Sequence, residues 1–197
     1  NMNTTKPLLV GLSGGNDSQV VCLSFMYAGV KFQPLIMRLH DGQGHYYNDH
    51  DTNGAFEFCK KYNLDYIVEE LNIDEFYTGW GLDLIKEYCI TVAEIAIQLY
   101  PVIKYKDTHA YVNGGGDPNI GYKQYLDGTS SLTYSLGPTP VQQYLIDRNM
   151  EGCMKFFMYT PEQLAAYLDN DTVHAFNNAR DQIYQGSRSD PWQYCVK

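Results

Sequence analysis

A short apolar run that ends in two glycines constrains this chain more than any other segment. Residues 8–18 read L-L-V-G-L-S-G-G-N-D-S, and a largely apolar stretch from Val20 to Met26 follows as a candidate buried helix. A strand, a tight turn and a helix start, in this order, build an anion site, because the helix N-terminus offers N–H groups and partial positive charge. Glycines let the backbone approach a phosphate closely, and we expect the hydroxyls of Ser13 and Ser18 to donate to it. An ordinary strand-to-helix turn needs only one glycine and a serine cap, so the segment predicts a phosphate site.

The loop differs from both common phosphate loops. A Walker A loop needs a lysine after its last glycine, and the dinucleotide fingerprint needs G-x-G-x-x-G, a spacing that Gly11, Gly14 and Gly15 do not have. The order S-G-G-x-D-S, complete from Ser13 to Ser18, resembles the PP-loop ATP pyrophosphatases, the adenine nucleotide α-hydrolase-like superfamily. Members cleave ATP between the α- and β-phosphates, usually to adenylate a carboxylate or carbonyl oxygen. The resemblance implies an ATP site formed by Leu12, Ser13, Gly14, Gly15, Asn16, Asp17 and Ser18.

Strand and helix patterns alternate through the first half of the chain, which indicates parallel βαβ units. We expect an open, mostly parallel α/β sheet with helices on both faces, as in the superfamily, over about residues 7–126 of a single domain 1–197. A small helical and loop extension would follow over about 127–197. The predicted strands are 8–12, 32–39, 64–71 and 110–113, and the predicted helices are 17–28, 52–62, 74–99 with a break at the glycines and an end at Pro101, and 161–183. The polar stretch 127–140 is predicted to be a loop.

A second glycine cluster follows the predicted fourth strand. From Gly114 to Tyr125 the chain reads G-G-G-D-x-x-x-G-Y-x-x-Y, which resembles the second ATP-site segment of the asparagine-synthetase branch of the superfamily. The resemblance implies that Gly114, Gly115 and Gly116 contact ATP, and that Asp17 and Asp117 hold Mg²⁺. Magnesium prefers one or two carboxylates together with phosphate oxygens and water, which agrees with such a pair. Pro118 departs from the branch, which carries a glutamate there. Lys123 is a candidate for neutralising charge on the α-phosphate.

The end of the second predicted strand is the candidate adenine site. Superfamily members contact adenine and ribose there, so we expect backbone groups of Met37 and Leu39 to pair with the adenine edge and His40 to lie beside them. His40, His45 and His50 recur at five-residue spacing among aspartates. Because that spacing aligns on neither a helix nor a strand, it favours a solvated loop over a metal site.

Composition narrows the range of partners. The 14 basic and 23 acidic residues give a net charge of −9, which disfavours a nucleic-acid partner. The sequence shows no apolar run near ~18 residues and no signal-peptide pattern, so we expect a cytoplasmic protein without a membrane span. Five scattered cysteines without C-x-x-C spacing predict buried thiols rather than a zinc site or a disulfide framework. The composition leaves open whether the chain forms a homo-oligomer.

The function that these features favour is an ATP-dependent adenylating enzyme. ATP and Mg²⁺ would bind across the two glycine clusters, and a small-molecule acceptor would be adenylated for amide or amine ligation. Asp17, Asp117 and Lys123 are the candidate catalytic residues. One alternative is a nucleotide-binding module without turnover, and another is a sulfonucleotide-reductase-like branch that would use Cys195. The acceptor cannot be deduced from the sequence.

Overall fold

The computed structural model describes residues 4–90, 93–114, 119–135, 140–158, 160–169 and 171. The chain divides into two compact units, the first formed by Asn1–Asp117 with Ser135–Phe156 and the second by Pro118–Tyr134 with Phe157–Lys197. The predicted phosphate loop belongs to the first unit.

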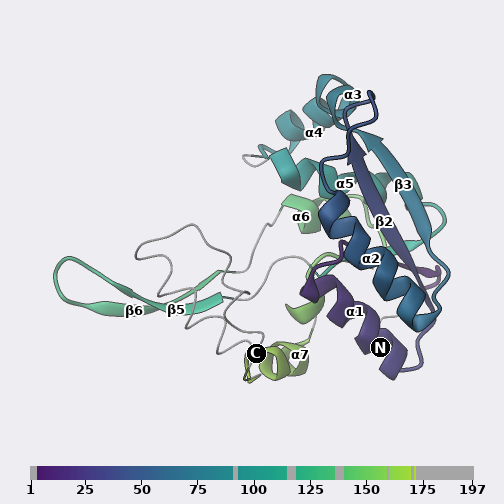
Figure 1. The fold of residues 1–197 in the computed structure, drawn as a ribbon. Helices are drawn as coiled ribbons and strands as arrows, with labels where there is room; N and C mark the ends of the chain where they lie inside the picture. The colour runs from purple at the N-terminus through teal and green to yellow at the C-terminus, as the bar shows by residue number, and fades with distance from the viewer. Residues whose placement is uncertain are drawn as a thin grey trace. The chain divides into compact units, whose positions relative to one another are not determined.

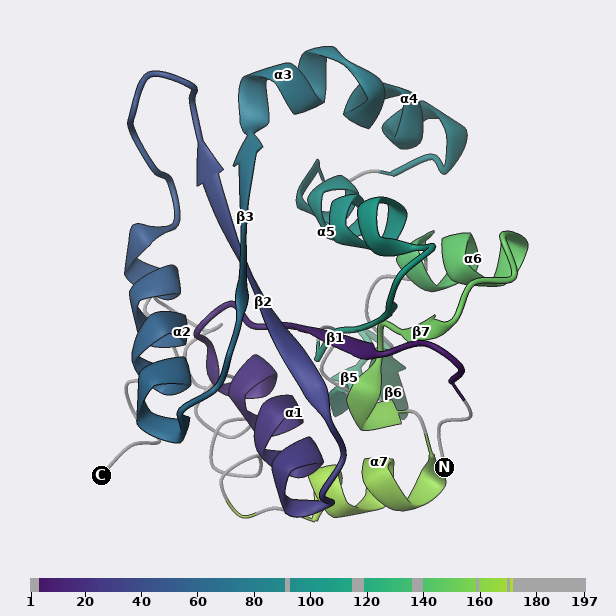
Figure 2. The same ribbon diagram turned by 90° about the vertical axis from the view of Figure 1, so that its right-hand side faces the viewer.

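The first unit contains a five-stranded sheet in the order β3-β2-β1-β4-β7, in which all neighbours run parallel (Figures 1 and 2). The strands are β1 (Leu8–Gly11), β2 (Phe32–His40), β3 (Ile67–Asn72), β4 (Ala110–Val112) and β7 (Gly152–Cys153). The first three strands add in one direction, and the chain then returns to place β4 on the other side of β1. This reversal makes the gap between β1 and β4 a topological switch point, where open parallel sheets bind ligands.

Helices cover both faces of the sheet, as the sequence predicted. The helices of this unit are α1 (Asn16–Tyr27), α2 (Asp49–Tyr62), α3 (Ile73–Thr78), α4 (Trp80–Glu87), α5 (Ala93–Tyr105) and α6 (Pro140–Asp147). Figure 2 shows α1 and α2 on one side of the strands and α5 and α6 on the other. Leu8, Leu9 and Val10 are consecutive and all buried, as expected for a strand that is covered from both sides.

Helix α5 corrects one sequence expectation. Pro101 was expected to end the helix, but it lies inside α5, which continues to Tyr105. Proline removes the hydrogen bond to the carbonyl of Ile97 and costs helix stability. The flanking side chains of Leu99 and Val102 are fully buried against the sheet, and this packing holds the helix together across the proline.

The second unit contains a two-stranded hairpin, β5 (Asn119–Gln124) with β6 (Ser130–Ser135), and helix α7 (Pro161–Leu168). A short 3-10 turn, η1 (Phe156–Met158), precedes α7. The hairpin corrects the loop predicted over 127–140, because β6 occupies much of that range. At its tip Gly128 has a φ of +81°, and the Asp127 carboxylate accepts a hydrogen bond from the Thr129 N–H (2.9 Å). Helix α7 begins at Pro161 as predicted, and the rest of the predicted helix to residue 183 lies mostly outside the described residues.

The cysteines behave largely as predicted. Cys22, Cys59 and Cys153 are buried free thiols, Cys89 is exposed, and Cys195 lies outside the described residues. Burial raises the pKa of Cys22 to about 12, so its thiol stays protonated and unreactive. Within the described chain, no helix has both the length and the apolar character needed to cross a bilayer.

Candidate functional site

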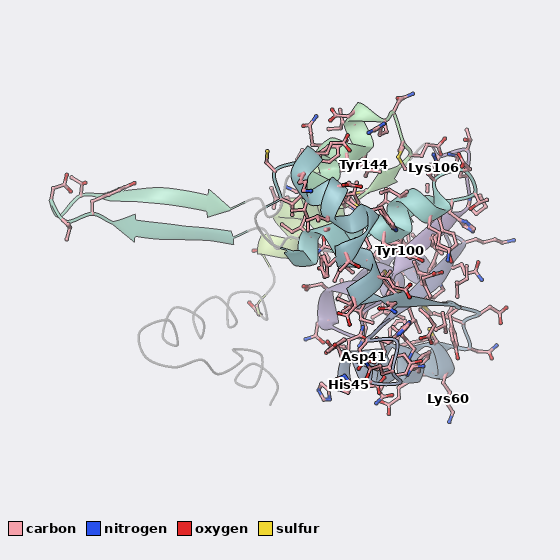
Figure 3. The ribbon with its side chains drawn as sticks, turned by 90° about the horizontal axis from the view of Figure 1, so that it is seen from above. Asp41, His45, Lys60, Tyr100, Lys106 and Tyr144 are labelled. Atoms are coloured by element: carbon pink, nitrogen blue, oxygen red, sulfur yellow. The ribbon has the colours of Figure 1, made fainter. Side chains whose placement is uncertain are left out.

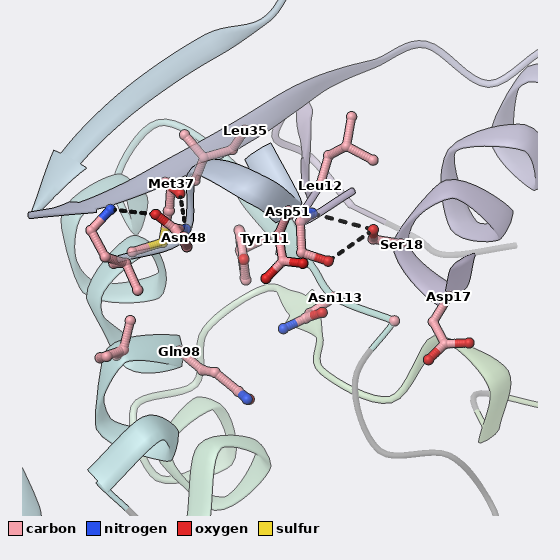
Figure 4. Close-up of a pocket in the computed structure, with 15 residues that line it drawn as sticks. Leu12, Asp17, Ser18, Leu35, Met37, Asn48, Asp51, Gln98, Tyr111 and Asn113 are labelled. Carbon is pink, nitrogen blue, oxygen red and sulfur yellow. Dashed lines mark hydrogen bonds between the residues drawn. The ribbon is translucent and has the colours of Figure 1, made fainter. Parts of the chain in front are cut away.

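A cleft of about 420 Å³ lies in the first unit, at the carboxyl ends of β1 and β4 (Figure 4). It is bordered by the loop after β1, the end of β2, the first turn of α2, the middle of α5 and the residues after β4. Its lining includes Leu12, Ser13, Asp17, Ser18, Met37, Leu39, Asn48, Asp51, Gln98, Tyr111, Asn113 and Gly114. The cleft therefore lies at the switch point and includes Leu12, Ser13, Asp17 and Ser18 of the first predicted loop. Gly14 and Gly15 instead line a separate pocket of about 380 Å³ beside the first turns of α2, together with His50, Asp51, Asn53, Gly54 and Glu57.

The loop after β1 packs backbone to backbone on α2. Gly14 has a φ of +96°, and a Cβ there would lie 1.9 Å from the carbonyl oxygen of Asp51. A Cβ at Gly54 would lie 3.4 Å from the Gly14 carbonyl oxygen, so the two glycines face each other. Glycine is required at position 14 for both its conformation and its contact.

Hydrogen bonds inside the loop fix its shape. The Ser18 hydroxyl donates to the Gly15 carbonyl (2.9 Å) and accepts from the Ser13 N–H (3.2 Å). The two serine hydroxyls also lie 3.1 Å apart, and Ser13 Oγ accepts from the Gly15 N–H (3.4 Å). The Gln19 side chain donates to the Gly14 carbonyl (2.7 Å). When Ser18 donates to the Gly15 carbonyl, Ser13 is the donor of the contact between the two hydroxyls, and both hydroxyl protons are then used within the loop.

The N-terminus of α1 opens on the cleft. Its N-cap residue is Gly15, which has no side chain to cap the first turn. Asp17 in that turn and Gly114 after β4 both line the cleft. A Cβ at Gly114 would lie 2.9 Å from Val21 Cγ2 and 3.1 Å from the Asp17 carbonyl oxygen. The start of the second glycine cluster therefore packs directly on the first turn of α1.

Tyr111 forms part of the cleft and was not singled out by the sequence. It lies on β4 with only 5% of its surface exposed, and Figure 4 shows it between Met37 and Ser18. A Cβ at Gly11 would lie 2.2 Å from the Tyr111 hydroxyl oxygen, so the glycine that ends β1 makes room for this hydroxyl. Burial raises the pKa of Tyr111, which keeps the hydroxyl protonated.

At the end of β2, Asn48 holds the backbone groups that the sequence assigned to adenine. Its side-chain nitrogen donates to the Met37 carbonyl (2.8 Å), and its side-chain oxygen accepts from the Leu39 N–H (2.9 Å). Asn48 is also the N-cap residue of α2, but its side chain does not cap that helix. The amide thus joins the loop before α2 to the edge of β2.

Asp51 is a second residue that the sequence analysis missed. It lies in the first turn of α2, lines the cleft, and its side chain points into it in Figure 4. The sequence placed it at the end of a polar loop. The usable signal was topological, because helix N-termini that follow parallel strands lie at the same edge as the strand carboxyl ends.

The remaining predicted residues lie elsewhere or outside the described chain. His40 ends β2 and its ring packs on Tyr46 (5.8 Å between centroids), while Asp41 accepts hydrogen bonds from the Gln43 and His45 N–H groups. Figure 3 shows Asp41 and His45 together, and His45 does not line the cleft. Among the described residues, no group of three or more His, Cys, Asp or Glu could hold a metal ion.

The second half of the predicted site cannot be placed in the cleft. Lys123 lies on β5 in the second unit. Gly115, Gly116 and Asp117 lie outside the described residues. Their predicted roles stay predictions.

No protein-family profile matches the chain, and no curated protein is similar to it in sequence. A solved structure, described as a predicted subunit of tRNA methyltransferase from Methanocaldococcus jannaschii, is similar in fold with a TM-score of 0.46 and 13% sequence identity. The similarity covers 96% of this chain and 92% of that chain. The strand order β3-β2-β1-β4-β7 and the parallel pairing define the α/β fold of the first unit.

Proposed function

We propose that this chain binds ATP with Mg²⁺ in the cleft and cleaves it between the α- and β-phosphates to adenylate a small-molecule carboxylate or carbonyl oxygen. The observation that supports this most strongly is the glycine-capped start of α1, which opens on a cleft at the switch point. The S-G-G-x-D-S order of the same loop resembles the PP-loop ATP pyrophosphatases. Assignment to that superfamily, and the finer likeness to its asparagine-synthetase branch, are part of the proposal.

Phosphate binding is assigned to the backbone rather than to the serine hydroxyls. Both hydroxyl protons of Ser13 and Ser18 are engaged within the loop, so the serines shape it. The N–H groups of the first turn of α1, from Asn16 onward, are the donors that remain for the pyrophosphate end of ATP. Gly15, the N-cap residue of α1, adds no side chain beside these donors.

The charges around the cleft fit a magnesium-bound nucleotide. Asp17 and Asp51 contribute carboxylates, and none of the described lining residues is a lysine or arginine. The charged side chains of the described lining are thus all carboxylates, which repel a triphosphate, and Mg²⁺ would supply the missing positive charge through one or two carboxylates and phosphate oxygens. Asp17 would hold the ion, with Asp117 as its proposed partner. Binding of ATP should therefore be lost when Mg²⁺ is removed with EDTA.

Catalysis in this proposal depends on positioning. The loop and the α1 N-terminus hold the pyrophosphate, and the cleft holds the α-phosphate beside the acceptor oxygen. That oxygen attacks the α-phosphorus, pyrophosphate leaves, and an amine then displaces AMP. Lys123 is the proposed group that neutralises charge on the α-phosphate.

Calorimetry of Mg²⁺·ATP binding tests the site. The Asp17→Ala variant should bind at least about tenfold more weakly, the equivalent of one contact with a charged group. Asp65→Ala removes the same charge from an exposed position outside the cleft, and His45→Ala changes a loop residue outside the cleft, so both should bind like the wild type. Equal affinity in Asp17→Ala and Asp65→Ala would contradict the site assignment.

A nucleotide-binding module without turnover is the second candidate. A module without turnover is favoured by the lining of the cleft, whose described residues include no basic side chain that could neutralise charge on the α-phosphate. A pyrophosphate-release assay across carboxylate and amine acceptors separates the two functions. Mg²⁺·ATP binding without release on any acceptor would favour the module.

A further inference from the structure

The proposed function assigns no contact to the Tyr111 hydroxyl. Only 5% of the surface of Tyr111 is exposed. Its hydroxyl makes no hydrogen bond with any other described residue. The residue lines the cleft, so a ligand bound there could reach its hydroxyl. A hydroxyl that makes no hydrogen bond with the described chain is free to donate to a ligand in the cleft, which a phenylalanine could not do.

A second position in the chain is adapted to the same hydroxyl. Gly11 ends β1 in an ordinary extended conformation, so its backbone does not require glycine. What excludes a larger residue is the hydroxyl oxygen of Tyr111, 2.2 Å from where a Cβ would stand. Two neighbouring strands, β1 with Gly11 and β4 with Tyr111, thus leave room for the hydroxyl beside the cleft.

The place of Tyr111 in the cleft indicates which part of a nucleotide it would meet. Figure 4 shows the ring between Met37, at the β2 end, and Ser18, at the loop end. A nucleotide with its phosphates at the start of α1 and its base toward β2 places its sugar between them. On this basis, which rests on the proposed function, we propose that the Tyr111 hydroxyl donates a hydrogen bond to a ribose hydroxyl and thereby selects ribonucleotides over deoxyribonucleotides.

The protonation state of Tyr111 agrees with a donor. Burial raises its pKa, and no carboxylate or cation is among the causes of that shift. The hydroxyl therefore keeps its proton at neutral pH and can donate to a neutral sugar hydroxyl.

The test compares ATP, 2′-deoxy-ATP and 3′-deoxy-ATP, each with Mg²⁺, by calorimetry on the full chain. Wild-type protein should bind ATP about 3- to 10-fold more tightly than the analogue that lacks the contacted hydroxyl, the range of one net hydrogen bond. Tyr111→Phe should lose that factor for ATP and bind the two ligands equally. Tyr27→Phe, a matched change at a tyrosine that is 90% exposed on α1, should keep the wild-type ratio.

Thermal melting separates a ligand contact from a structural role. Because the hydroxyl has no partner in the described chain, Tyr111→Phe should melt at the wild-type temperature or higher. A lower melting temperature with an unchanged ratio between ATP and its analogues would overturn the proposal, and so would equal ratios in wild type and variant. Absence of any Mg²⁺·ATP binding by the wild type would instead contradict the proposed function itself.

Discussion

Three glycines in and beside the cleft each lie where a Cβ would collide with another part of the chain. A Cβ at Gly11 would meet the Tyr111 hydroxyl at 2.2 Å, one at Gly14 would meet the Asp51 carbonyl at 1.9 Å, and one at Gly114 would meet Val21 at 2.9 Å. From the sequence, the role expected of these glycines was to let a phosphate come close to the backbone. The structure adds a second reason, since the glycines also let β1, β4, α1 and α2 converge around one point. Their contact partners are distant in sequence, so no local pattern could name them.

At this scale we predict that Gly11 and Tyr111 are energetically coupled. Gly11→Ala should lower the free energy of unfolding by about 1–3 kcal/mol, because it overpacks a buried contact. In the Gly11→Ala/Tyr111→Phe double variant the nearest remaining ring atom is Cζ, 3.0 Å from the new Cβ, and part of the loss should be recovered. Urea denaturation of the four proteins gives the coupling energy. Strict additivity of the two changes would show that the hydroxyl is not what excludes alanine.

Among the elements, the parallel sheet was predictable and several connections were not. Apolar runs such as Leu8–Val10 predict strands buried on both faces, and the turn residues between them predict helical crossovers. The β5–β6 hairpin was missed because the glycines and prolines around it are typical of loops. The continuation of α5 through Pro101 depends on tertiary packing that propensity does not contain. The sequence did not predict that the first turn of α2 borders the cleft, because Asp49–Asp51 resemble the polar residues before them.

One prediction for these elements concerns the link from α2 to β2. Asn48→Ala removes both side-chain hydrogen bonds to the backbone of β2 and leaves Met37 and Leu39 without those partners. We expect a loss of about 1–3 kcal/mol in the free energy of unfolding. Asn53→Ala, an exposed change on the same helix, is the matched control and should cost far less. Equal losses in the two variants, measured by urea denaturation, would mean that the Asn48 bonds contribute little.

A second prediction for the elements concerns the link from β3 to α5. Glu69 on β3 is 7% exposed and accepts hydrogen bonds from Tyr100 (2.7 Å), Tyr105 (2.9 Å) and Lys104 of α5. Burial alone raises the pKa of this carboxyl, but the three donors outweigh it and hold the pKa below its usual value of 4.5. The stabilisation is then fully present above pH ~4.5 and is lost as the pH falls through the lower folded-state value.

Comparison with Glu69→Gln tests that dependence. The wild type should be more stable than Glu69→Gln by about 1–2 kcal/mol at pH 7, and the difference should shrink below pH ~4.5. Glu57→Gln, at an exposed site on α2, should stay close to the wild type at neutral pH. Denaturation curves at a series of pH values give the difference directly. A difference that stays constant to pH 3 would show that the Glu69 carboxylate is not stabilised by folding.

For the whole molecule, nearly all of the described core belongs to the first unit. The buried cluster on the α5 side of the sheet has its described members between Leu9 and Met154, all of them in the first unit. The sequence predicted one domain with an extension and could not show that the segment 118–134 would cluster separately. The division does not follow the order of the chain, because the first unit includes Ser135–Phe156, which comes after the segment 118–134 in sequence.

We therefore predict that the hairpin can be removed without unfolding the first unit. Replacing residues 119–134 by a short Gly-Ser linker should leave a cooperative thermal transition by circular dichroism, since these residues belong to the other compact unit. Mg²⁺·ATP affinity of the shortened chain, measured beside it, shows whether the hairpin contributes to binding. Loss of the cooperative transition would show that the first unit depends on the hairpin.

The contact between Gly14 and the backbone of α2 matters for anyone who would engineer this protein. Moving the predicted phosphate loop to a new scaffold cannot succeed as a transfer of residues 12–18 alone. The transplant must include the first two turns of α2, with Gly54, because they form the surface on which the loop packs. The smallest portable part of the proposed binding site is thus two segments that meet only in the folded chain.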